Sequence, residues 1–272
     1  MNAVWTAKVR YLLRLGISLP ILPYLYWLGK RIQTRMPALP EAARNRMGKI
    51  AFPRASIQPL NILCIGESSM AGVGVEDHRD GLAGVISDKI HRFSRRSVRW
   101  TVVAQSGLTA KEVRENLVPQ IPKQMYDLIV IGLGGNDTFQ MSSPLKWHQA
   151  FRDLLDSLRQ KHHNSKIVIA NMPPVRWFPA FPPLLRWLMT GQIQLLKQAI
   201  VDLPQRFENV FFLQEHIRLD GQYTEQGKQF RHRDLFSDGV HPTKLAYRLW
   251  GEQIAEFICD KALGHLHTPT GK

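Results

Sequence analysis

The sequence predicts an α/β protein, a three-layer α/β/α sandwich built on a five-stranded parallel sheet. Between residues 59 and 272, short apolar runs rich in β-branched residues alternate with longer amphipathic segments. The short runs are apolar throughout rather than alternating, which is typical of strands that are buried on both faces. Strands and helices that alternate in this way favour a parallel sheet with helices on both sides.

Five strands and five helices follow from this pattern. The predicted strands cover residues 61–65, 100–104, 128–133, 166–170 and 210–213. The predicted helices cover residues 81–94, 109–119, 144–162, 185–202 and 243–262. Parallel sheets bind their ligands at the carboxyl ends of the strands. The residues directly after each strand are therefore the candidates for a functional site.

Residues 1–58 are predicted to form a basic, apolar extension and a linker, ahead of a domain over residues 59–272. Residues 1–60 contain ten Lys or Arg and one acid, so they carry +9 of the net charge of +14. Within residues 11–29 the only charged side chain is Arg14, and Pro20 and Pro23 interrupt the apolar run. Residues 36–58 include three prolines, lack clear periodicity, and are predicted to be the linker.

A basic segment of this kind can bind nucleic acid or an anionic membrane. Residues 15–28 are mostly apolar or aromatic and have Lys and Arg on both sides, a composition typical of a bilayer interface. We therefore expect membrane association through an uncleaved anchor that spans or lies on the bilayer, and no nucleic-acid partner. The side of the membrane stays open. The alternative is a core or docking helix of this chain's own soluble domain, in a cytoplasmic protein.

Four short blocks at the predicted strand ends and near the C-terminus carry residues suited to acyl chemistry. Ser68 follows the first strand, Gly107 the second and Asn136 the third, and Asp238 precedes His241 by three residues. Alone, each block has a simpler explanation: a helix cap, a turn glycine, an Asx turn or a helix start. Together they supply a nucleophile, oxyanion donors and a base with its acid at one sheet edge.

These blocks resemble those of the SGNH subgroup of the GDSL hydrolases, which is named for blocks that carry Ser, Gly, Asn and His. The match runs over roughly residues 60–262, in the family's order. The resemblance implies a flavodoxin-like SGNH hydrolase fold with a catalytic triad of Ser68, Asp238 and His241. It also implies an oxyanion hole formed by Ser68, Gly107 and Asn136. The chain departs from the family at Glu67, where Asp is usual, and at Gln105, where Asn is common.

The resemblance implies a serine esterase that cleaves carboxylic esters without a metal or another cofactor. Residues 172–189 are rich in Trp, Phe and Pro, and they suggest an acyl-binding rim or a packed, proline-stiffened loop. Together with the apolar N-terminus they favour small lipid-like esters as substrates. The alternatives are an acyltransferase or carbohydrate deacetylase with the same triad, and a non-catalytic binding module attached to a membrane. The two cysteines, Cys64 and Cys259, are expected to pack as free thiols.

Overall fold

The centre of the computed structural model is a six-stranded sheet in the order β1-β3-β2-β4-β5-β6. The structure describes residues 3–35, 37–52, 58–218, 223–225 and 228–264. Five strands are parallel, and they confirm the predicted runs to within two residues at each end: β2 Leu60–Gly66, β3 Val98–Ala104, β4 Leu128–Gly132, β5 Lys166–Ile169 and β6 Val210–Phe212.

The sixth strand makes the sheet mixed and corrects the prediction of five parallel strands. β1 (Met47–Ile50) pairs antiparallel with β3, and it lies in the segment predicted to be a linker. Its neighbour Ala42 is buried, and the Ala42 N–H donates to the Ala71 carbonyl at 3.0 Å. The segment predicted to be a linker is therefore part of the domain. Residues 47–50 form a strand of the sheet, and Ala42 is bonded to the turn after β2. Pro53 of the predicted linker lies outside the described residues, as do residues 265–272 of the predicted domain.

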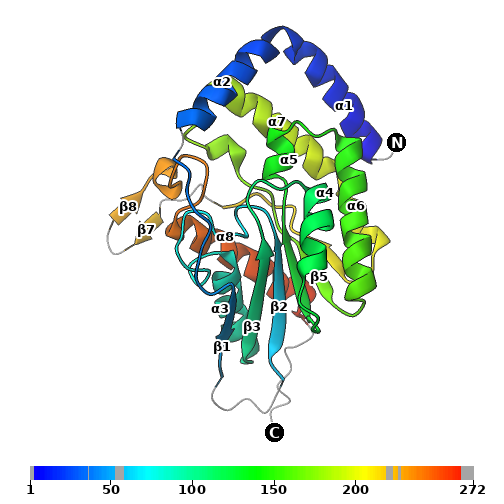
Figure 1. Ribbon diagram of the computed structural model, residues 1–272, viewed down its shortest axis with the longest axis vertical. Coiled ribbons are helices and arrows are strands. Elements are labelled where there is room, and N and C mark those ends of the chain that lie inside the picture. Colours follow the sequence, from blue (N-terminus) through cyan, green and yellow to red (C-terminus); the bar gives the residue numbers. More distant parts are fainter. Residues whose placement is uncertain (1–2, 36, 53–57, 219–222, 226–227, 265–272) are drawn as a thin grey trace.

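Helices cover both faces of the sheet (Figure 1). Alternate residues of one strand face opposite sides, so Ile62 and Cys64 pack with the helices α3 and α8, whereas Leu63 and Ile65 pack with α4 and α6. This double burial explains why the strands are apolar throughout. The helices of this domain are α3 Leu82–Ser94, α4 Ala110–Glu112, α5 Gly135–Phe139, α6 Pro144–Lys161, α7 Pro183–Ala199 and α8 Lys244–Phe257.

Two of the predicted helices have irregular ends. The helix predicted over residues 109–119 is α4 followed by a π-helical turn, Val113–Leu117, and a 3-10 turn, Val118–Gln120. The last predicted helix ends with a π-helical turn, Ile258–Ala262. Two short strands, β7 (Tyr223–Glu225) and β8 (Lys228–Phe230), pair antiparallel. Cys64 and Cys259 are buried and unpaired, as expected, and burial raises the pKa of the Cys64 thiol to about 12.

The N-terminal segment forms two helices, α1 (Ala3–Ser18) and α2 (Leu22–Arg35), which meet at an angle of 83°. The break falls between Pro20 and Pro23, as the prolines predict. Figure 1 shows the pair as an arch above the end of the sheet where β2 and β3 finish. Val4 and Ala7 of α1 are buried in the core, and α1 packs on α6 and α7. No single helix in the described ranges is long and apolar enough to cross a membrane, although the bent pair passes that test by length and composition.

Candidate active site

The carboxyl ends of the central strands lie side by side, so the loops that follow them open at one edge of the sheet. Gly66, the last residue of β2, is in register with Ala104 at the end of β3 and with Gly132 at the end of β4. A side chain at Gly66 would collide with the Gly132 carbonyl, so this close approach of two strands requires glycine. The register brings the loops of Ser68, Gly107 and Asn136 together.

Ser68 is the accessible residue of a buried turn. Every other residue from Ile62 to Val73 is buried, whereas Ser68 is half-buried. The Val73 N–H donates to the Ser68 carbonyl at 3.1 Å and closes the turn. The following helix, α3, begins only at Leu82, so Ser68 lies in a long turn rather than at a helix start. The neighbouring Ser69 is 6% exposed, which makes Ser68 the serine that a substrate can reach.

Glu67 joins the turn after β2 to the turn after β4. One carboxylate oxygen accepts the Gly135 N–H at 2.7 Å and the other accepts the Asn136 N–H at 2.8 Å. Burial raises the pKa of Glu67 to about 7, even though the two N–H groups favour the charged form. Glu67 therefore sets the position of the backbone that carries Asn136. Its extra methylene relative to Asp still allows both hydrogen bonds.

The two candidate oxyanion donors other than Ser68 lie on adjacent loops. Gly107 is exposed, has a φ of +88°, and faces open space where a side chain would project. The Asn136 side-chain amide donates to the Leu108 carbonyl at 3.1 Å. The Asn136 side chain also hydrogen-bonds Glu67, whose charged form it favours, so these contacts together orient the amide. The Gly107 N–H and the Asn136 amide are the candidate donors to an oxyanion at this edge.

Asp238 and His241 form a hydrogen-bonded pair. His241 Nδ1 lies 2.7 Å from one Asp238 carboxylate oxygen, and the other oxygen accepts the N–H groups of Val240 and His241 at 2.9 and 2.7 Å. The Asp238 side chain is 1% exposed, and burial alone would raise its pKa. The hydrogen bonds from His241 and from the two backbone N–H groups outweigh burial and lower the pKa of Asp238. A charged Asp238 holds the imidazole with Nε2 available as a base.

The loop of Asp238 and His241 lies against the turn of Ser68. A side chain at Gly74 would meet the Pro242 carbonyl, and the Tyr247 hydroxyl donates to the Val73 carbonyl at 2.8 Å. No hydrogen bond joins Ser68 to His241 among the described residues; in enzymes without substrate, such bonds are often long. The structure thus places all five predicted site residues at one sheet edge, on four separate segments, with Asn136 in the first turn of α5 and the other four in loops.

Glu41 is a residue that sequence reasoning did not assign to the site. One of its carboxylate oxygens accepts the Ser106 N–H at 2.6 Å, beside Gly107, and the other pairs with Arg46 at 2.6 Å. Arg46 in turn donates to the Ala104 carbonyl at 3.0 Å. One feature of the sequence sets Glu41 apart, since it is the only acid in the first 60 residues. Its partner is 65 positions away, which no local pattern indicates.

The aromatic segment after β5 packs against the loop of Asp238. Phe178 and Phe181 are buried, Trp177 stacks on His232 with ring centres 4.1 Å apart, and the Ala180 N–H donates to the Gly239 carbonyl at 3.2 Å. Trp187 remains 49% exposed. The segment therefore packs against the protein, and the Trp187 ring at its end is accessible. No group of three or more His, Cys, Asp or Glu side chains is placed to hold a metal ion in the described part of the chain.

Comparisons with known proteins identify the family and the fold. The family model described as the GDSL-like lipase/acylhydrolase family matches residues 64–249. The lipase Lip_vut3 from a goat rumen metagenome is 22% identical, with a TM-score of 0.53, over 72% of this chain and 96% of that chain. A lipase/acylhydrolase from Enterococcus faecalis is 15% identical, with a TM-score of 0.50, over 74% and 96%. A family 3 carbohydrate esterase from Clostridium thermocellum is 14% identical, with a TM-score of 0.54, over 79% and 100%. No curated protein matches the sequence. At these identities the solved structures establish the fold.

Proposed function

Because the chain belongs to the GDSL-like lipase/acylhydrolase family, we propose that it hydrolyses carboxylic esters with Ser68 as nucleophile. The observation that carries the proposal is the Asp238–His241 pair at 2.7 Å, in a loop that packs on the turn of the accessible Ser68. A serine, an oriented imidazole and a buried carboxylate are the groups that nucleophilic acyl transfer requires.

The proposed reaction has two halves. His241 Nε2 takes the proton of the Ser68 hydroxyl as its oxygen attacks the ester carbonyl, and the negative charge forms on the carbonyl oxygen. The N–H groups of Ser68 and Gly107 and the Asn136 amide stabilise this oxyanion. The intermediate expels the alcohol, which receives the proton from His241. Water then repeats the sequence on the acyl-enzyme, releasing the acid and restoring Ser68.

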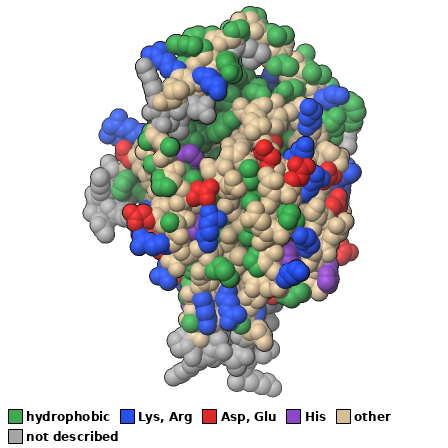
Figure 2. All heavy atoms as spheres, viewed as in Figure 1, with side chains coloured by type: hydrophobic (Ala, Val, Ile, Leu, Met, Phe, Trp, Pro, Cys, Tyr) green, Lys and Arg blue, Asp and Glu red, His purple; other side chains and the backbone are tan. Residues whose placement is uncertain are grey.

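The proposed substrates are amphiphilic esters at a membrane surface. Large apolar side chains are exposed along α1, α2 and the 3-10 turn between them, among them Ile17 at 72%, Tyr26 at 70% and Leu19 at 60%. Figure 2 shows hydrophobic side chains gathered over the top of the molecule, where these helices lie. A contiguous exposed apolar surface with basic neighbours is typical of membrane contact. We propose that the arch of α1 and α2 rests on a membrane and that acyl esters reach Ser68 from there.

A panel of esters with acyl chains of increasing length tests the proposal, with Ser68→Ala as the inactive control. We expect rates per enzyme to rise with chain length, and Ser68→Ala to lower them at least about a thousandfold. Full activity of Ser68→Ala would refute the mechanism. Activity on acetyl esters alone would refute the lipid-like substrate and favour the second candidate, a carbohydrate deacetylase. Acyl transfer would appear as a new ester when an alcohol acceptor is added.

A further inference from the structure

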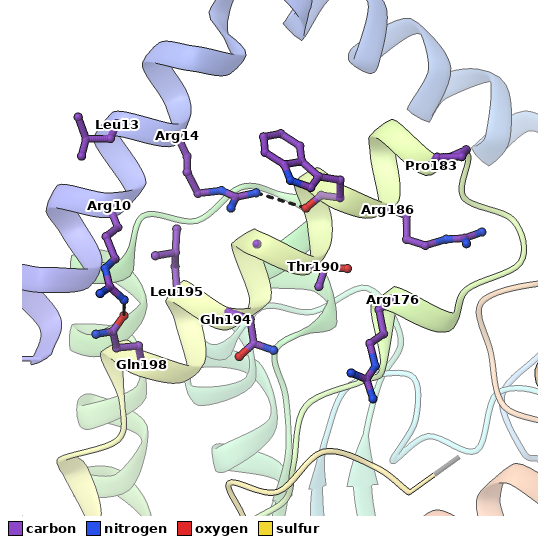
Figure 3. A pocket seen from close by; sticks show the side chains of 12 residues that line it. Arg10, Leu13, Arg14, Arg176, Pro183, Arg186, Thr190, Gln194, Leu195 and Gln198 are labelled. Carbon is purple, nitrogen blue, oxygen red and sulfur yellow. Dashed lines mark hydrogen bonds between the residues drawn. The ribbon is translucent and has the colours of Figure 1, made fainter. Parts of the chain in front are cut away.

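A cavity of about 770 Å³ lies between α1 and α7, apart from the residues of the candidate active site. Four arginines line it: Arg10 and Arg14 from α1, Arg186 from α7, and Arg176 from the segment between β5 and α7. No acidic residue is among its lining residues. In Figure 3, Arg14 reaches from α1 across to α7, and Arg176 stands on the segment below.

The four arginines are not neutralised by the protein. None of them makes an ion pair with an acidic side chain within the described residues. Like charges that share a cavity repel one another, and their repulsion grows as water is excluded. Burial removes water from around the Arg14 guanidinium and so lowers the pKa of Arg14. A cavity with this charge is suited to an anion.

Neutral groups hold the arginines in place. Arg14 donates to the Trp187 carbonyl at 3.3 Å, and its guanidinium lies 4.5 Å from the centre of the Trp187 ring. Gly191 leaves the room that the Arg14 guanidinium occupies. Arg186 donates to the Phe178 and Phe181 carbonyls at 3.3 and 2.8 Å. These contacts fix the positions of the side chains without cancelling their charges.

Two polar atoms of the lining lack a partner in the protein. Arg186 Nε and Thr190 Oγ1 are both buried and make no hydrogen bond among the described residues. Buried polar groups are normally hydrogen-bonded, so these two atoms have unused hydrogen-bonding capacity beside the cavity. A phosphate group offers several acceptor oxygens and matches the fork of an arginine.

The other part of the lining is apolar and accessible. Leu13 is 63% exposed and Trp187 is 49% exposed, and both line the cavity beside the arginines. Leu13 lies on α1, which carries the exposed apolar side chains described above. The cavity therefore presents a cationic wall next to a surface suited to an acyl chain. A ligand that fits both is an anionic amphiphile.

We propose that this cavity binds the phosphate group of an anionic lipid, with its acyl chains on the surface of Leu13 and Trp187. The proposal rests on the membrane contact proposed above. It also links that contact to the candidate active site, because the segment of Arg176 and Arg186 is bonded to Gly239, next to Asp238, through Ala180. The ring of Phe181 lies 5.8 Å from that of Phe139, on the helix that carries Asn136.

Vesicle binding of the Ser68→Ala protein tests the proposal without any turnover. The probes are vesicles of phosphatidylcholine alone and vesicles in which about one lipid in three is phosphatidylglycerol. We expect the second kind to bind at least about tenfold more tightly, and Arg14→Gln/Arg176→Gln to remove most of that difference. Should this double variant unfold, Arg10→Gln/Arg176→Gln replaces two exposed arginines of the same cavity.

The matched control is Arg99→Gln/Arg152→Gln, which removes two exposed arginines that lie outside the cavity and whose side chains make no hydrogen bond or ion pair among the described residues. The control should keep the preference for phosphatidylglycerol. An unchanged preference in the cavity variant, or an equal loss in the control, would overturn the proposal.

Competition with glycerol 3-phosphate at constant ionic strength then separates the two sources of phosphate. Displacement from the vesicles means that the free phosphate ester suffices, and no displacement means that the bilayer lipid is needed. Displacement and its absence each support the proposed site, provided that the cavity variant has lost its preference for phosphatidylglycerol vesicles. Because binding is measured on Ser68→Ala, failure of ester hydrolysis would refute the proposed function and leave this result intact.

Discussion

Glu67 shows how one residue next to the nucleophile can control the site without taking part in the chemistry. Its two carboxylate oxygens receive the N–H groups of Gly135 and Asn136, so it ties the Ser68 turn to the Asn136 turn. The carboxylate is fully buried, and desolvation raises its pKa to about 7. A change in its protonation state therefore changes the hydrogen bonds that position an oxyanion donor.

The raised pKa of Glu67 predicts a pH dependence of stability. The carboxyl group of an unfolded chain titrates near about 4.3, so between that value and about 7 the folded protein binds the proton more tightly. The contribution is therefore fully present below about pH 4.3 and is lost as pH rises through about 7. The free energy of unfolding of the wild type, relative to Glu67→Gln, should fall by on the order of 3 kcal/mol over this interval.

Urea unfolding at several pH values from 5 to 8 measures this difference, with the exposed Glu208→Gln as the control. Glu208→Gln should follow the wild type at every pH. A constant difference between the wild type and Glu67→Gln across this range would contradict the assignment of a titrating, buried Glu67.

At the scale of elements, the strand β1 and the residues before it complete the site from outside the parallel sheet. Glu41 binds the Ser106 N–H, and its partner Arg46 binds the Ala104 carbonyl at the end of β3. The loop that carries Gly107 is therefore held by a segment that precedes the first parallel strand. This arrangement makes Glu41 a positioning residue for one of the proposed oxyanion donors.

Replacing Glu41 should lower turnover while leaving the fold intact. In Glu41→Gln the charge and one strong acceptor are lost, so the Gly107 loop is less well positioned and kcat should fall about tenfold, with a smaller change in KM. The control is Glu76→Gln, which breaks an ion pair of the same segment, Arg44–Glu76, whose side chains are 64% and 88% exposed. Equal kinetics for both variants and the wild type would show that Glu41 has no such role.

The elements differ in how well the sequence predicts them. β2 and β4 are apolar throughout because both their faces are buried, and this burial leaves a signal that a single sequence carries. β1 has four partly exposed residues, including a glycine that makes room for the Trp100 ring, so its own sequence has no strand pattern. Its pairing depends on β3, about 50 residues away, and this long-range contact could not be predicted locally.

The candidate site likewise combines residues that the sequence indicates with supporting residues that it does not. The placement of Ser68, Asn136 and His241 at one sheet edge was predictable because each follows a recognisable strand or precedes a helix within a few residues. The hydrogen bonds of Glu41 and Glu67 cross 65 and 68 positions, so the supporting residues emerge only when the strands are in register. The sequence also predicted the break at Pro20 and Pro23, but it did not predict that α1 docks on α7 and forms one side of an open, arginine-lined cavity.

At the scale of the whole molecule, the sheet positions the chemistry and the arch of α1 and α2 provides an apolar surface above it (Figures 1 and 2). We expect this surface to drive binding to uncharged vesicles. Replacing Ile17, Leu19 and Tyr26 by Ser removes three of the most exposed apolar side chains and should weaken binding to phosphatidylcholine vesicles more than about tenfold.

The control for this surface is a triple variant with exposed apolar residues elsewhere. Met47→Ser/Met125→Ser/Leu145→Ser removes side chains that are 64%, 62% and 41% exposed and lie outside α1 and α2. Cosedimentation with vesicles compares the two variants with the wild type. Equal binding of both would contradict the proposed role of the arch.

Covalent labelling with a fluorophosphonate probe tests the central claim most directly, because the probe reacts with a serine that a neighbouring base activates. We predict one equivalent of label on the peptide that contains Ser68, no label in Ser68→Ala or His241→Ala, and full label in Ser69→Ala. Label that persists in Ser68→Ala, or that maps to Ser69, would contradict the account.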